Sequence, residues 1–184
     1  MIDQLAAALP RLDGSARDAV GRTAELLVRT FDAGGRVYVC GNGGSAADAQ
    51  HIAAELIGRF RRERPPLPCV ALTTDTSVLT AWGNDYSFED VFARQVEGLG
   101  APGDVLWALS TSGRSRNILA AADAARQRGM KVVAMTGSAG GPLAERADVC
   151  FRAPAERTDL VQQLHQLAYH AVCEIVEEHF APHG

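Results

Sequence analysis

The sequence predicts an α/β fold, a single doubly wound parallel sheet of five strands in the flavodoxin-like manner, with extra helices at both ends. Short β-rich runs alternate along the chain with segments whose apolar residues recur at helical spacing. The β-rich runs are apolar throughout, as expected for strands whose sheet is covered by helices on both faces. Two of these runs lead into turns rich in glycine or hydroxyl residues just before a helix.

The N-terminal segment is expected to be helical to about residue 33. Between residues 15 and 32, apolar side chains recur on one helical face, and Gly34 follows as a stop signal. A shorter helical piece is expected over 5–9, before Pro10 breaks it.

The α/β core is expected over about 35–152 and a long C-terminal helix over about 158–180, so that residues 1–184 form one domain. Ser45 is a plausible N-cap for the first core helix. The prolines and charges of 61–68 indicate a surface loop. The expected strands are 36–40, 69–72, 104–110, 131–136 and 149–151, and the expected helices after the first segment are 46–58, 88–97, 115–128 and 158–180.

Composition excludes several classes of protein. The chain has 18 Lys plus Arg against 22 Asp plus Glu, a net charge of −4, without the basic excess of many nucleic-acid binders. No apolar run is long enough to span a bilayer, and the start lacks the pattern of a secretion signal. The four cysteines form no CxxC pair. We therefore expect a cytoplasmic protein with no nucleic-acid partner and no membrane anchor.

Two turns have the chemistry of anion sites. Gly41-Asn-Gly-Gly-Ser45 follows the first strand, and Ser110-Thr-Ser-Gly-Arg-Ser115 follows the third. Glycine lets the backbone approach a ligand, and the unpaired N–H groups of the following helix favour a phosphate. Each turn alone is also consistent with a tight strand-to-helix connection. A dinucleotide fingerprint fits Gly41 and Gly43 only weakly, because its ribose-binding acid would lie too far along the chain, at Asp75.

A second candidate site combines two helices. His51 and Glu55 are four residues apart and so share a helical face, near the strand ends if that helix runs as predicted. The final helix carries Gln162, Gln166 and His170 at four-residue spacing. Imidazole, carboxylate and amide oxygen are acceptable zinc ligands. The alternatives are a surface ion pair and a solvated or subunit-facing glutamine stripe.

Two further features have open readings. Asn84 and Asp85 follow a glycine, which indicates either a turn or side chains that bind sugar hydroxyls. His165 and His179 are lone histidines of the last helix, and we expect them to be structural or exposed.

These residues carry a resemblance over nearly the whole chain. The sequence resembles the sugar isomerase (SIS) domain family and, within it, the phosphoheptose isomerases. The segments that resemble the family most are GNGGSAADAQH over 41–51, ELIGR over 55–59, GND over 83–85, STS over 110–112, and 162–170.

The resemblance implies that D-sedoheptulose 7-phosphate is converted to D-glycero-D-manno-heptose 7-phosphate by proton transfer through an enediolate. It also implies one Zn²⁺ per subunit and a homotetramer with active sites at subunit boundaries. Glu55 and His170 match the family's acid–base pair, and the metal positions match His51, Glu55, Gln162 and His170. The substrate positions match Asn42, Gly43, Gly44, Ser45, Glu55, Asn84, Asp85, Ser110, Thr111, Ser112, Ser115 and Gln162.

A relative of the same fold offers the main alternative. It is a non-enzymatic protein that binds the bacterial replication initiator, and the segments 61–68 and 75–80 resemble it. That relative is expected to lack the acid at Glu55 and the histidine at His170. This chain has both, which a protein without proton-transfer chemistry does not need, so the sequence favours the enzyme.

Overall fold

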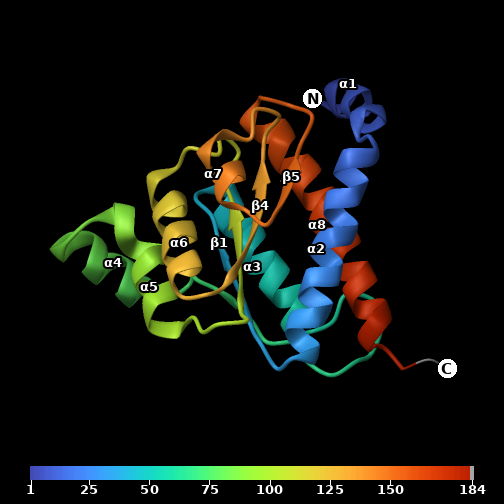
Figure 1. Ribbon diagram of the computed structural model, residues 1–184. Helices are drawn as coiled ribbons and strands as arrows, with labels where there is room; N and C mark the ends of the chain where they lie inside the picture. Colours follow the sequence, from blue (N-terminus) through green and yellow to red (C-terminus); the bar gives the residue numbers. More distant parts are fainter. Residues whose placement is uncertain (183–184) are drawn as a thin grey trace.

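The computed structural model describes residues 1–182, which form a parallel sheet between two layers of helices (Figure 1). None of the helices in this part is both long and apolar enough to span a bilayer. The strands are β1 (Val37–Cys40), β2 (Cys69–Ala71), β3 (Val105–Leu109), β4 (Lys131–Thr136) and β5 (Val149–Arg152). The helices are α1 (Ile2–Ala8), α2 (Gly14–Asp32), α3 (Gly44–Ile57), α4 (Thr76–Asp85), α5 (Val91–Leu99), α6 (Arg116–Gln127), α7 (Gly141–Arg146) and α8 (Thr158–Phe180), with short 3₁₀ turns η1 (Leu9–Arg11) and η2 (Phe88–Asp90).

All five strands are parallel and lie in the order β2-β1-β3-β4-β5, which confirms the predicted fold class. Val39 of β1 lies between Ala71 of β2 and Trp107 of β3. Every residue of β1 and β3 is buried, which explains why these strands read as continuous apolar runs. After β1 the chain adds β2 on one side of it and then β3 on the other, so the order of the strands switches direction between β1 and β3. Open α/β sheets bind ligands at such a switch point.

Each face of the sheet has its own core. Val37 and Val39 point to the face covered by α2, α3 and α8, whereas Tyr38 and Cys40 point to the face covered by α5, α6 and α7. Figure 1 shows the two helical layers on either side of the strands. Helices α3 and α8 cover the same face of the sheet, and their residues contact each other there.

The structure corrects several predicted element boundaries. The first core helix begins at Gly44 with Gly43 as its N-cap, so Ser45 is not the cap but a buried residue of the first turn. Asp75 caps α4 by accepting a hydrogen bond from the backbone N–H of Val78, in a segment where the glycine and asparagine had indicated only a turn. The short helix α7 was also not predicted, and the segment expected as a helix over 88–97 is divided into η2 and α5.

Candidate active site

Helices α3 and α8 each follow a parallel strand, so both run back across the sheet in the same direction, side by side. Polar residues join them at three points. The amide of Gln162 lies against Gly44 near the start of both helices. His51, Glu55 and His170 meet further along and are called the histidine–glutamate cluster below. Near the ends of both helices, Glu177 binds the segment that follows α3.

The histidine–glutamate cluster brings three potential ligand atoms together. Nε2 of His51 is 2.9 Å from Oε1 of Glu55 and 3.5 Å from Nε2 of His170. The three ligand atoms all lie within 4.8 Å of one another. The side chains of His51 and Glu55 are 39% and 18% exposed, so the cluster is accessible from solvent. Two imidazoles and a carboxylate are a donor set that fits zinc.

The ring of His170 is held by other rings. It stacks on Phe60 at 5.4 Å between centroids, and the rings of Tyr169 and His51 lie edge-on at 4.8 and 5.0 Å. Burial lowers the pKa of His170, and the neighbouring His51 lowers it further. The neutral imidazole, which accepts a proton or binds a metal, is therefore favoured at neutral pH.

The two glycine- and hydroxyl-rich turns are adjacent. Asn42, in the turn after β1, and Asn117, in the first turn of α6, exchange two side-chain hydrogen bonds of 2.8 Å. Because β1 and β3 are neighbours in the sheet, both turns lie at the same edge and at the switch point.

The second turn presents hydroxyls around a tight backbone. The hydroxyls of Ser110 and Ser115 are 3.1 Å apart, and Ser112 is exposed with its hydroxyl accepting from the N–H of Arg114. Gly113 has φ +63°, and a Cβ there would lie only 1.9 Å from the carbonyl oxygen of Gly140. The turn thus needs glycine. It leaves the exposed Ser112 and the start of α6 to face an anion, whereas Ser110 is buried.

The structure does not bring all candidate residues to one place. The expectation that His51 and Glu55 lie near the strand ends is wrong, because α3 runs back from that edge and Glu55 lies about 16 Å beyond Gly44 along the helix axis. Gln162 lies against Gly44, about 12 Å along α8 from His170, and the cluster closes without it. Its role as a metal ligand stays a prediction.

Asn84 and Asp85 lie on the other face of the sheet from the cluster. They are exposed at the end of α4, where Nδ2 of Asn84 donates a 2.8 Å hydrogen bond to Asp85. Helix α4 packs against η2 and α5. Within one chain these two residues are therefore separate from the histidine–glutamate cluster.

Sequence reasoning missed the polar groups that stand behind the cluster. Tyr169 is fully buried, and its hydroxyl lies 3.0 Å from Nδ1 of His51 and 3.5 Å from Oδ1 of Asp48. Asp48 precedes His51 by three residues and so shares its helical face, which is a signal the sequence did contain. No spacing in the sequence joins Tyr169 to His51, because the two lie on different helices.

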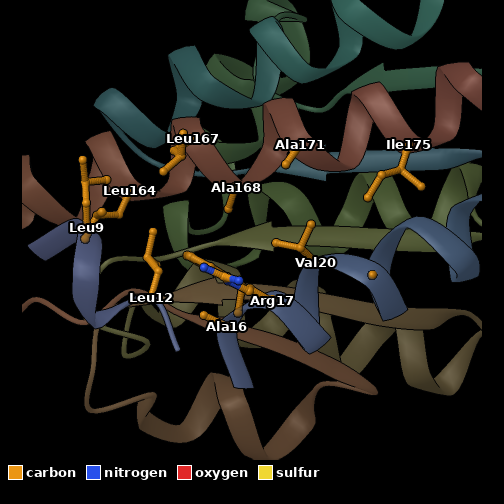
Figure 2. A pocket seen from close by; sticks show the side chains of 12 residues that line it. Leu9, Leu12, Ala16, Arg17, Val20, Leu164, Leu167, Ala168, Ala171 and Ile175 are labelled. Carbon is orange, nitrogen blue, oxygen red and sulfur yellow. The ribbon is translucent and has the colours of Figure 1, made fainter. Parts of the chain in front are cut away.

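A groove of about 410 Å³ lies between α2 and α8 with residues of η1 at its end (Figure 2). Leu9, Leu12, Val20, Leu167 and Ile175 contribute its apolar surface, and Arg17 is its charged side chain. No acid, histidine or nucleophile lines this groove. Its lining therefore suits apolar contact.

The comparisons with known proteins agree with this architecture. Residues 2–137 match the family model of the SIS domain. Phosphoheptose isomerase of Rhodospirillum rubrum is 53% identical over 90% of this chain and 88% of its own, and that of Roseiflexus sp. is 57% identical over 84% and 78%. The structure of phosphoheptose isomerase from Neisseria gonorrhoeae superposes with a TM-score of 0.91 at 43% identity, covering 96% of this chain and 95% of the other.

Proposed function

The chain belongs to the SIS domain family, and from that premise we propose that it converts D-sedoheptulose 7-phosphate to D-glycero-D-manno-heptose 7-phosphate. It is an isomerase, since relatives more than half identical over most of both chains bear the name phosphoheptose isomerase. The observation that supports this reaction best is the meeting of His51, Glu55 and His170 in one accessible cluster. None of the comparisons reported above favours the initiator-binding alternative.

The reaction moves a carbonyl from C2 to C1. A base removes a proton from C1 of the ketose, an enediolate forms, and the proton is returned to C2 while the hydroxyl proton passes from O1 to O2. Glu55 is the carboxylate that carries the proton between the carbons. His170, which is favoured in its neutral form, transfers the proton between the two oxygens.

We propose one zinc ion per subunit, held by His51, Glu55 and His170. The family resemblance implies Gln162 as a further ligand, but in this chain its amide lies against Gly44, so it would have to leave that contact or come from another subunit. When bound, zinc supplies positive charge that stabilises the enediolate oxygens. His51 and His170 would contribute neutral nitrogens to this site, and the Nε2 lone pair of His170 would hold the metal or take a proton, not both at once. Glu55 lies within 4.8 Å of both nitrogens and its side chain is 18% exposed, so we assign it the roles of ligand and base.

The hydroxyls of Ser110, Thr111, Ser112 and Ser115 bind the phosphate together with the N-terminus of α6. Binding this remote group helps to orient the reacting end of the substrate. The sugar contacts assigned by resemblance are Asn42, Gly43, Gly44, Ser45, Asn84 and Asp85.

A homotetramer with sites at subunit boundaries completes this proposal. Within one chain, Glu55 lies about 16 Å beyond Gly44 along the axis of α3. This separation exceeds the length of the extended seven-carbon sugar phosphate. The phosphate turn of one subunit therefore serves the histidine–glutamate cluster of another. The apolar groove between α2 and α8 offers a contact surface for such an assembly. The free cysteines of the chain suit the reducing cytoplasm, where we place the reaction.

The test is an NMR time course of sedoheptulose 7-phosphate with the purified, zinc-supplemented protein. We expect signals of the aldoheptose 7-phosphate to appear at the expense of the ketose. No conversion by protein whose folded state is verified by circular dichroism would overturn the proposal. A binding assay with the replication initiator would then be the next experiment.

A further inference from the structure

A buried polar chain stands behind the histidine–glutamate cluster. The hydroxyl of Tyr169 lies between two groups, Nδ1 of His51 at 3.0 Å and Oδ1 of Asp48 at 3.5 Å. Tyr169 is 0% exposed, and Oδ2 of Asp48 is buried without a hydrogen-bond partner. These groups have few alternatives, so the direction of each hydrogen bond can be worked out.

The single proton of the Tyr169 hydroxyl decides the direction. A carboxylate has only acceptors, so Asp48 takes that proton if it takes part at all. By the same rule Oε1 of Glu55, 2.9 Å from Nε2 of His51, accepts a hydrogen bond there only from an Nε2–H, and a bound metal ion would take the place of that proton. The alternative gives the tyrosine proton to Nδ1 of His51 and leaves the Asp48 carboxylate with both oxygens unpaired, one of them buried. An unsatisfied buried charged group is costly, which favours the first arrangement. The tyrosine oxygen then accepts from Nδ1–H of His51.

We propose that Asp48 and Tyr169 are positioning residues that keep a proton on Nδ1 of His51, so that Nε2 is the nitrogen left to bind zinc between Glu55 and His170. The proposal rests on the proposed role of His51 as a metal ligand. Metal-binding histidines commonly donate their second N–H to an acceptor that fixes the ring and makes the ligand more basic. Here the acceptor is a tyrosine oxygen that a carboxylate polarises in turn.

The same tyrosine orients both histidines. Its ring lies edge-on to His51 at 5.5 Å and to His170 at 4.8 Å between centroids. Tyr169 therefore fixes the His51 ring by a hydrogen bond and the His170 ring by packing. Loss of the hydroxyl alone removes the first effect and leaves the second.

Zinc affinity, measured by competition with a chromophoric chelator, tests the proposal. We expect Tyr169→Phe to weaken zinc binding about 10- to 100-fold. The matched control is Tyr86→Phe, which removes a hydroxyl from a side chain that is 72% exposed, and it should bind zinc as the unmodified chain does. Asp48→Ala should weaken binding similarly, and Asp48→Asn less, because the amide oxygen still accepts the tyrosine proton.

NMR of the ¹⁵N-labelled, zinc-loaded protein gives a readout that a purely structural role would not move. We expect a slowly exchanging, downfield Nδ1–H signal from His51 that disappears or moves upfield in Tyr169→Phe. Thermal unfolding shows whether Tyr169→Phe and Asp48→Ala are folded. If either is not, Asp48→Asn, at a half-buried site, takes its place in both measurements.

Unchanged zinc affinity in Tyr169→Phe and Asp48→Ala, or zinc bound through Nδ1 of His51, would overturn the proposal. Either result leaves sugar-phosphate turnover by the unmodified protein untouched. Failure of the proposed reaction has a different signature, because the unmodified chain would then bind zinc and show the Nδ1–H signal without converting substrate.

Discussion

The same two helices carry two polar contacts of opposite character. In the histidine–glutamate cluster, the side chains of His51 and Glu55 are partly exposed, and the three potential ligand atoms lie within 4.8 Å of one another. Two turns further along α8, Glu177 and Arg64 form what we call the clamp, with side chains 3% and 1% exposed. The clamp is closed to solvent and the cluster is open to it, although both join α3 to α8.

Backbone groups pair with most of the polar atoms of the clamp; Nε of Arg64 is buried without a hydrogen bond, 3.6 Å from Oε1 of Glu177. The carboxylate of Glu177 accepts hydrogen bonds from the N–H groups of Phe60, Arg61 and Arg62 at 2.7, 2.7 and 3.0 Å. The guanidinium of Arg64 donates to the carbonyls at the end of α3, including that of Glu55 at 2.6 Å. The comparison teaches that burial together with several backbone hydrogen bonds makes a charged pair structural, whereas the accessible groups of the cluster remain available to a ligand.

The largest expected effect is the loss of turnover when the acid of the cluster, Glu55, is replaced. Glu55→Gln keeps the shape but removes the base, so we expect kcat to fall about 10²- to 10⁴-fold. Thermal unfolding should change little, because the side chain is not part of the clamp. The control Glu63→Gln, at a side chain 90% exposed, should keep full activity. Wild-type turnover in Glu55→Gln would remove Glu55 as the base.

A substitution in the clamp should lower stability and leave turnover largely intact, the opposite of Glu55→Gln. Glu177→Gln leaves the buried guanidinium of Arg64 without its counter-charge, so we expect the free energy of unfolding to fall by about 3–5 kcal/mol. Turnover per folded molecule should fall far less than in Glu55→Gln. Urea unfolding measures the change. Glu174→Gln is the matched control on the same helix, because Glu174 pairs with Arg61 at the surface and should cost less than about 1 kcal/mol.

Acidification should weaken the clamp. Burial raises the pKa of Glu177, but the hydrogen bonds from Arg61, Phe60 and Arg62 and the charge of Arg64 outweigh it and hold the pKa below the ordinary 4.5. A lowered folded-state pKa means that this stabilisation is complete above pH 4.5 and is lost as the pH falls through the folded-state pKa. Unfolding between pH 3 and 6 should therefore be steeper in pH for the unmodified chain than for Glu177→Gln, and equal slopes would contradict the account.

The smallest effect is expected at the hydroxyl turn. Ser112→Ala removes one hydroxyl from a site that also has backbone N–H groups and three more hydroxyls, so we expect KM to rise about fivefold, equivalent to about 1 kcal/mol. Steady-state kinetics measure the change against Ser77→Ala, at an exposed serine of α4. A KM equal to that of the control would count against phosphate binding at this turn.

Periodicity and turn chemistry were sufficient to predict the sheet and most helices, because the central strands β1 and β3 are buried and apolar and the helices α2, α3, α5 and α6 end at or just before a glycine. They failed at α4, where a glycine and an asparagine lie inside a helix that its packing stabilises. The lone histidines of α8 show no such failure. His165 is structural as expected, fully buried with Nε2 3.0 Å from the carbonyl of Thr136, and burial lowers its pKa to about 4.

The cluster itself was only partly predictable. The four-residue spacing of His51 and Glu55 predicts their contact, because both lie on one helix. The contact of His51 with His170 joins α3 to α8 and depends on how the helices pack, which local spacing does not determine. For the same reason the clamp was invisible in the sequence, where Arg64 belongs to a segment that indicated only a charged surface loop.

Anomalous diffraction at the zinc edge, from crystals of the active protein grown with zinc, tests the central claim most directly. The account predicts a peak between His51, Glu55 and His170, about 2.0–2.2 Å from the nitrogen and oxygen ligands, and none at the clamp. An active protein whose zinc lies elsewhere, with the cluster closed only by its own hydrogen bonds, would contradict it.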